Sequence, residues 1–168
     1  MNEGFTIRFV EENDLIALEW EGEYYRFRNM YRDIYNQSLK GNALLWVIEI
    51  NGAGVIGQIF SQLNSGNPKL ADGKRRAYLF SFRIKQRYQG QGWGSLLLKH
   101  AEGELLKKGF QCTTLFVSKS NDPALLFYLH RGYVIVGEEK GQWSYIDADG
   151  INQFVNDPSW RMEKWLGD

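Results

Sequence analysis

Three glycines at alternate positions, Gly90, Gly92 and Gly94, stand between an apolar, β-prone run at 78–84 and a stretch with the apolar spacing of one helix face. The first amides of a helix have no intrahelical acceptor, and the helix dipole adds about half a positive charge at that end. Glycine lacks the Cβ atom that would hold an anion away from these amides, and it permits positive φ angles. The segment 89–95 is therefore predicted to bind a phosphate group.

Three known phosphate-binding patterns can be compared with this segment. The P-loop pattern needs Lys followed by Ser or Thr after its last glycine, and neither pair occurs in that register. The dinucleotide-binding pattern would put Ser95 in place of its third glycine, and it expects an acidic residue at the end of the next strand, where residues 111–117 contain none. The third pattern, Gln/Arg-x-x-Gly-x-Gly/Ala, fits in full from Gln89 to Gly94.

A second motif follows downstream, in residues 117–133. It combines a strand, an Asn-x-x-Ala helix start at Asn121 and an aromatic-x-x-x-Gly-aromatic ending from Tyr128 to Tyr133. With these two motifs in this order, the chain resembles the GNAT superfamily of N-acetyltransferases, of the single-domain, prokaryotic type. The resemblance covers residues 44–137 well and the two ends of the chain only loosely.

The resemblance implies acetyl-CoA as the co-substrate, without a metal ion. Residues 89–95 would hold its pyrophosphate, and Asn121 would meet the pantetheine. The main chain of Arg83 and Ile84 would bind the pantetheine arm, which lies like an added strand where the central strand and the following strand splay apart. The candidate coenzyme contacts are thus Phe82, Arg83, Ile84, Gln89, Gly90, Gln91, Gly92, Trp93, Gly94, Ser95 and Asn121.

Acetyl transfer from a thioester to an amine needs a neutral amine and a protonated sulfur leaving group. An alkylamine with a pKa near about 10.4 is almost wholly charged at neutral pH, so that a base or a chain of waters must take its proton. Tyr128 matches the family's tyrosine general acid, and a neutral phenol can donate a hydrogen bond to the departing thiolate. Tyr128 is therefore the candidate catalytic residue.

The general base has no evident candidate on the central strand, because residues 78–84 contain no carboxylate. Either Glu21, Glu23 or Glu49 acts through water, or the amine arrives already neutral. Gln89, in place of the arginine that other family members use, keeps a donor but loses a charge-assisted bond to phosphate. Further positive potential would come from Lys85 and Arg87.

By the resemblance, the acetyl acceptor binds beside two N-terminal helices, which are predicted at 15–19 and at 24–35. The connection between these two helices borders the acceptor pocket, and the candidate contacts are Trp20, Glu21, Glu23 and Tyr24. The identity of the acceptor stays open among small amines, antibiotics, amino acids, protein N-termini and lysines.

A covalent route through the single cysteine is not favoured. Cys112 is predicted at the start of a strand, at the end remote from the glycines and without an adjacent histidine. Direct attack by the amine within a ternary complex is therefore the preferred mechanism.

The elements that must position these residues alternate along the chain. Tyr24, Phe27, Tyr31, Ile34 and Tyr35 form a helical stripe. A helix at 15–19 is expected with Asp14 as its cap, and a further helix is expected after Asn121 or Asp122. Strands are predicted at 6–10, 44–50, 55–61, 78–85, 113–117, 133–137, 143–146 and 160–165, with a helix at 95–108. The expected fold is α/β, with a single mixed, mostly antiparallel sheet that contains a parallel, splayed strand pair and is flanked by helices.

Composition bounds the class of protein. The 168 residues, 43% of them hydrophobic, suit one domain over 1–168. The net charge of zero gives no general attraction to nucleic acid or to anionic membranes, and neither partner is expected. One cysteine and the lack of a signal peptide favour the cytoplasm. The aromatic C-terminal strand is a hint of a homodimer.

Two classes of function remain from the sequence, and a third is weaker. The first is an acetyl-CoA-dependent N-acetyltransferase that acts on a primary amine. The second is a catalytically silent acyl-CoA-binding regulatory module, which the missing carboxylate on the central strand would favour. A nucleotide-binding domain is the third.

Overall fold

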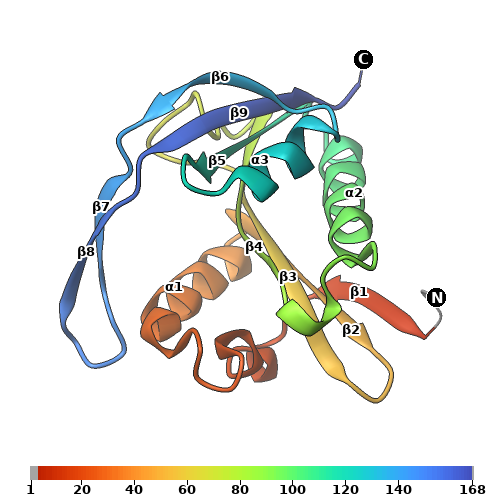
Figure 1. Ribbon diagram of the computed structural model, residues 1–168, viewed down its shortest axis with the longest axis vertical. Helices are drawn as coiled ribbons and strands as arrows, with labels where there is room; N and C mark the ends of the chain where they lie inside the picture. The colour runs from red at the N-terminus through yellow and green to blue at the C-terminus, as the bar shows by residue number, and fades with distance from the viewer. Residues whose placement is uncertain (1–3, 168) are drawn as a thin grey trace.

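The computed structural model describes residues 4–167 as one seven-stranded sheet with helices on both sides and a separate two-stranded hairpin (Figure 1). The sheet order is β1-β2-β3-β4-β5-β9-β6, and only the β4–β5 pair is parallel. The predicted fold class is confirmed. The strands of the sheet are β1 (Phe5–Phe9), β2 (Ala43–Ile50), β3 (Gly54–Gln62), β4 (Arg76–Ile84), β5 (Cys112–Ser118), β6 (Val134–Glu139) and β9 (Ser159–Trp165).

The helices and the hairpin complete the described chain. The α-helices are α1 (Arg28–Leu39), α2 (Trp93–Lys107) and α3 (Asp122–Leu129), and the hairpin strands are β7 (Gln142–Ile146) and β8 (Asn152–Asn156). Four single turns of 3₁₀-helix are η1 (Glu12–Asp14), η2 (Ala17–Glu19), η3 (Tyr25–Phe27) and η4 (Gln86–Tyr88).

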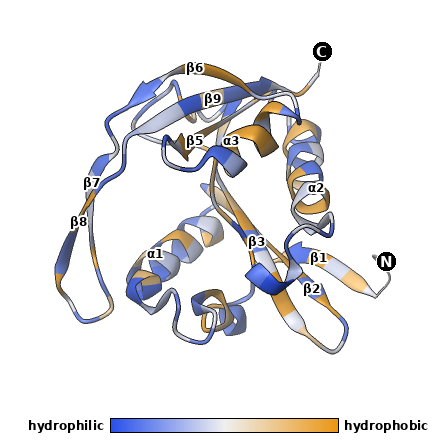
Figure 2. Cartoon of the chain, in the orientation of Figure 1, coloured by the Kyte–Doolittle hydropathy of each residue, from blue (hydrophilic) through white to orange (hydrophobic). Residues whose placement is uncertain are grey.

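Two hydrophobic cores lie on the two faces of the sheet. The predicted face of α2, with Trp93, Leu97, Ala101 and Leu105, is fully buried against β2, β3 and β4, and α3 packs on the same core. The other core forms where Tyr31 of α1 and the N-terminal turns meet the opposite face. Burial of each large apolar side chain stabilises the fold by about 1.5–3 kcal/mol. Figure 2 shows this pattern, with hydrophobic residues on the strands and on α3 and a mostly hydrophilic β7–β8 hairpin.

The parallel pair separates soon after it forms. β4 and β5 are paired only from Arg76 with Cys112 to Tyr78 with Thr114, and residues 79–84 of β4 have no pairing with β5 (Figure 1). Because the rest of β4 keeps its partner β3 on the other edge, the main-chain groups of 79–84 that face β5 are available to an added strand.

A bulge in β4 changes the direction of the side chains that follow it. Between the pairs Phe60–Phe80 and Gln58–Arg83 the strand contains an extra residue, and Ser81 there has a φ of 49°, in the left-handed region. As a result Phe82 contacts α3, whereas Arg83 contacts the aromatic residues beside α1.

One prediction for the N-terminal part of the chain is wrong, and one strand was not predicted. Asp14 does not cap a helix at 15–19, because its carboxylate accepts the Glu11 main-chain N–H at 2.7 Å and an Arg8 N–H at 2.7 Å. The chain forms η1 and η2 instead of that helix, and it turns at Trp20, which has a left-handed φ of 49°. Strand β8 was not predicted from the sequence, because its side chains are mostly polar and show no apolar alternation. Its one large apolar side chain, Phe154, is 81% exposed in the structure.

Candidate active site

The glycine loop ends where α2 begins. Gly92 is the N-cap of α2, and Gly90 and Gly92 have φ angles of 76° and 91°, which other residues rarely adopt. A Cβ atom on either glycine would have no atom of the described residues within 4 Å, so the space above the loop is open. Since the first helical bond runs from the Leu96 N–H to the Gly92 carbonyl at 3.1 Å, the amides of 93–95 precede the helical hydrogen bonds.

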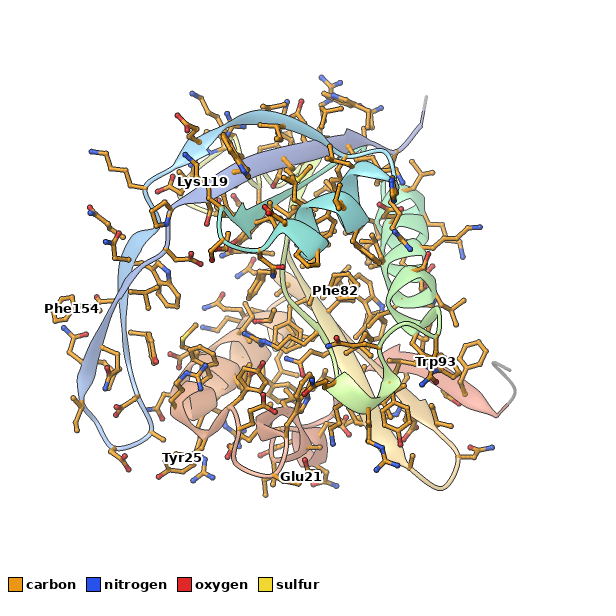
Figure 3. All side chains as sticks on the ribbon, in the orientation of Figure 1. Glu21, Tyr25, Phe82, Trp93, Lys119 and Phe154 are labelled. Atoms are coloured by element: carbon orange, nitrogen blue, oxygen red, sulfur yellow. The ribbon has the colours of Figure 1, made fainter. Side chains whose placement is uncertain are left out.

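Two glutamine side chains of the loop form hydrogen bonds to neighbouring main-chain carbonyls. The Gln89 amide donates to the Ile84 carbonyl at 2.8 Å, and the Gln91 amide donates to the Arg87 carbonyl at 3.2 Å. Trp93 is buried against Phe5 of β1, with ring centroids 5.7 Å apart, and Figure 3 shows it beside that strand. Anion binding at this loop would thus depend on main-chain amides.

Arg131 is a residue near the loop that the sequence did not single out. Its guanidinium lies 3.6 Å from the ring centroid of Phe127, and it donates to the Ser95 hydroxyl at 3.2 Å. Its position inside the aromatic-x-x-x-Gly-aromatic ending was the only available signal. The arginine adds a positive charge beside the start of α2.

Asn121 caps α3 as predicted, with its side-chain oxygen accepting the Ala124 N–H at 3.1 Å.

Tyr128 lies in the last turn of α3, next to the gap between β4 and β5. Its ring packs on Phe82, Phe127 and Tyr133 with centroid distances of 6.4, 5.4 and 5.5 Å. Burial raises the pKa of Tyr128 well above the usual value of a phenol, and the phenol of Tyr78 adds to this effect. The side chain is therefore protonated at any physiological pH and can donate a proton.

A cavity of about 640 Å³ opens on the α1 side of the same gap. Its walls come from α1, β3, β4, the end of β5, the β3–β4 loop and the base of the hairpin, and most of its large side chains are aromatic. The lining residues are Phe27, Met30, Tyr31, Ile34, Phe60, Asn67, Leu70, Tyr78, Leu79, Phe80, Ser81, Arg83, Phe116, Ser118, Glu139, Gly141, Gln142, Trp143, Asp157 and Ser159.

Comparison with known proteins agrees with this arrangement. The model of the acetyltransferase (GNAT) family matches residues 12–133. The chain belongs to the GNAT acetyltransferase family. No curated protein matches the chain by sequence.

Solved GNAT structures share the fold of this chain at low sequence identity. The ribosomal-protein-S18-alanine N-acetyltransferase of Escherichia coli is 21% identical, with a TM-score of 0.71 over 98% of this chain and 95% of that one. Ard1 of Thermoplasma volcanium is 19% identical, with a TM-score of 0.73 over 98% and 99%. The spermidine N-acetyltransferase of Vibrio cholerae, in complex with CoA and spermine, is 19% identical, with a TM-score of 0.70 over 98% and 97%.

The four predicted acceptor contacts of this GNAT chain do not line the cavity. Trp20 is buried, and Glu21 forms an ion pair with Lys85 at 3.0 Å. Glu23 is exposed, and Tyr24 lies beneath the guanidinium of Arg83, whose central carbon is 4.3 Å from the ring centroid. The wall of the cavity in this part of the chain is formed instead by the next turns along, in η3 and α1.

The carboxylates of the cavity also differ from those expected. Glu49, one of the predicted remote bases, is bound to Arg8 at 2.9 Å. Among the described residues, the carboxylates that line the cavity are those of Glu139 and Asp157. The pKa of Tyr78 rises to about 12, first through burial and then through the negative charge of Glu139. Charged residues at strand ends are common, so the sequence alone could not single out these two.

Cys112 lies at the start of β5, as predicted. Its thiol is buried, and burial raises its pKa to about 11, with the nearby Arg76 acting against that rise. A neutral thiol at the paired end of β5 is a poor nucleophile. Within residues 4–167 no cluster of three His, Cys, Asp or Glu residues could hold a metal ion, and no helix is both long and apolar enough to span a bilayer.

Proposed function

We propose that this GNAT protein transfers the acetyl group of acetyl-CoA to a primary amine, by direct attack in a ternary complex. One observation carries the proposal: the part of β4 that is unpaired with β5 runs from residues 79–81, which line the aromatic cavity, to Ile84, whose carbonyl accepts a hydrogen bond from Gln89 of the glycine loop, and Tyr128 packs on Phe82 between them. A two-substrate reaction needs this arrangement, because the thioester must arrive from one side and the amine from the other.

The coenzyme would be held mainly by main-chain groups. The amides of residues 90–95 would bind the pyrophosphate at the start of α2, with the positive charge of Arg131 close by. The unpaired edge of β4 at 82–84 would bind the pantetheine arm as an added strand, and Asn121 would meet it from the start of α3. The complex of the Vibrio cholerae enzyme with CoA supports this choice of coenzyme at the level of the fold.

The reaction then follows from the position of the groups. The amine nitrogen attacks the carbonyl carbon, a C–N bond forms, the C–S bond breaks, and coenzyme A leaves as a thiol. Tyr128 gives the sulfur its proton and regains one from solvent. The proton lost by the amine passes to water, and Glu139 and Asp157, which line the cavity, replace the remote glutamates as the nearest carboxylates to receive it.

Thiol release with acetyl-CoA and a panel of primary amines tests this proposal, together with calorimetric binding of acetyl-CoA. Release that depends on both substrates, without an acetylated enzyme intermediate, is the expected result. Binding of acetyl-CoA without turnover of any amine would favour the silent acyl-CoA-binding module, for which the lack of a carboxylate on β4 is the supporting observation. Preferential binding of NAD or ATP would favour a nucleotide-binding domain.

The cellular setting of the protein is part of the same proposal. A single buried cysteine fits a reducing compartment, and we infer the cytoplasm. A homodimer remains a prediction that sedimentation analysis can test.

A further inference from the structure

The side chain of Arg83 packs on aromatic residues beside α1. The bulge at Ser81 turns it toward α1, where its guanidinium lies 4.3 Å from the ring centroid of Tyr24 and 5.5 Å from that of Phe27. One of its N–H groups donates to the Tyr31 hydroxyl at 3.2 Å. Two aromatic faces and one hydrogen bond thus fix the orientation of the guanidinium before any ligand binds.

Arg83 has no carboxylate partner among residues 4–167, although it is half-buried and lines the cavity. Among the other half-buried arginines of the sheet, Arg8 binds Asp14 at 2.7 Å and Arg76 binds Glu163 at 2.7 Å, whereas Arg161 has no ion pair within residues 4–167. A guanidinium has five N–H donors in a fixed fork, and the hydrogen bond to Tyr31 uses one of them. The remaining donors match a carboxylate, which can accept two parallel bonds.

Two negatively charged side chains also line the same cavity. Glu139 and Asp157 are exposed, and each already accepts one hydrogen bond, from the Gly141 N–H at 3.2 Å and from the Ser118 hydroxyl at 2.7 Å. These carboxylates suit a positively charged amine as it enters. A purely cationic acceptor would meet repulsion from Arg83, which is less screened by solvent than the two exposed carboxylates.

We propose that Arg83 binds a carboxylate of the acetyl acceptor, so that the acceptor is an amino acid or a similar carboxylated amine. The aromatic walls formed by Tyr78, Phe80 and Phe116 suit an apolar or aromatic body between its two charges. This inference rests on the proposed acetyl transfer, and it names the class of acceptor. Arg83 acts as a specificity-determining residue, through its side chain, on the opposite side of β4 from the coenzyme.

Matched pairs of amines test the proposal by turnover. Each pair joins an amino acid to its decarboxylated amine: phenylalanine with phenethylamine, leucine with 3-methylbutylamine, and lysine with cadaverine. Wild-type protein is expected to prefer the amino acid. Arg83→Met should lower kcat/KM for the preferred amino acid by about 10- to 100-fold, or about 1.4 to 2.8 kcal/mol, and change the paired amine less than about 2-fold. Arg83→Lys should restore part of the loss.

Arg26→Met is the matched control. The Arg26 guanidinium lies 5.3 and 4.6 Å from the ring centroids of the same two residues, Tyr24 and Phe27, but Arg26 does not line the cavity. This variant should leave the preference for the carboxylate unchanged. Circular dichroism melts of all variants establish that they are folded. An equal loss for both members of a pair in Arg83→Met, or a wild-type preference for the decarboxylated amines, would overturn the proposal.

Binding of carboxylic acids, measured without turnover, tests the carboxylate site at Arg83 independently of the proposed acetyl transfer. Calorimetry measures the affinity of the CoA-bound protein for 3-phenylpropionate and 4-methylpentanoate, which carry the carboxylate but no amine. Affinity that falls about 10-fold or more in Arg83→Met would support the carboxylate site even if no amine were acetylated, and in that case only the proposed reaction would fail. If wild-type protein bound neither acid and acetylated no amino acid, the carboxylate site itself would be ruled out.

Discussion

At the scale of single residues, Tyr128 in the last turn of α3 and Tyr133 in the segment after it have different roles. The Tyr133 hydroxyl is fully engaged, since it lies 2.8 Å from the Thr113 hydroxyl and 2.8 Å from the Glu102 carboxylate. The Tyr128 hydroxyl makes no hydrogen bond to the described residues. A phenol hydroxyl without a protein partner is free to donate to a ligand, so Tyr128 is the one suited to chemistry.

Tyr128→Phe is expected to lower kcat by about 10²-fold or more, because the departing thiolate loses its proton donor. The dissociation constant of acetyl-CoA should change less than about 3-fold, since the ring that packs on Phe82 remains. Stopped-flow turnover and calorimetry measure the two quantities. Tyr35→Phe, a part-buried tyrosine on the other core, is the control. An unchanged kcat would remove Tyr128 from the mechanism.

At the scale of elements, the start of α2 and the bulge in β4 determine the geometry of the site. Both rely on residues in the left-handed region: Gly90 and Gly92 in the loop, and Ser81 in the strand. The glycines adopt it at little cost, whereas a serine pays about 1–2 kcal/mol, which the pairing of β4 with β3 must offset. The bulge that holds Ser81 in this conformation directs the Arg83 side chain toward the cavity.

Gly92→Ala should destabilise the fold by about 1–2 kcal/mol and weaken acetyl-CoA binding about 10-fold, because alanine strains the left-handed φ of 91° and shifts the amides that follow. Gly103→Ala, in the middle of α2 with a helical φ and open space at its Cβ, should instead stabilise the fold by about 0.5–1 kcal/mol. Chemical denaturation and calorimetry measure these effects. Equal effects of the two substitutions would contradict the role of Gly92.

At the scale of the whole molecule, the β7–β8 hairpin extends beside α1 (Figure 1), and Gln142 and Trp143 of β7 line the cavity. The Asn29 side chain donates to the Asp147 carbonyl at 2.7 Å, and the Tyr25 hydroxyl donates to Asp149 at 3.0 Å. Phe27 packs on Tyr145 with ring centroids 5.1 Å apart. The hairpin is thus held against η3 and α1 by contacts between residues more than a hundred positions apart in the sequence.

Trp143→Ala should raise the KM of the acceptor by about 5- to 50-fold, since Trp143 lines the cavity, and leave the KM of acetyl-CoA unchanged. Phe154→Ala is the control from the same hairpin, because Phe154 is 81% exposed and points away from the body of the protein (Figure 3). Steady-state kinetics with each substrate varied in turn provides the measurement. A similar rise in both KM values for Trp143→Ala would indicate a general loss of structure.

The sequence alone determined the order of the main elements and the glycine loop. These features are local: glycines at 90 and 92, the apolar spacing from Trp93 to Leu105 and the cap at Asn121 each act within a few residues. For the same reason the sequence could predict a phosphate-binding segment at 89–95 and place Tyr128 on a helix.

Only the tertiary structure decided which side chains line the cavity. The bulge at Ser81 depends on the register of β4 against β3, and it alone determines which face Arg83 occupies. Glu139 and Asp157 reach the cavity through the pairing of β6 and β9 and the return of the hairpin. Strand register and long-range pairing depend on contacts between distant segments, which no local pattern encodes.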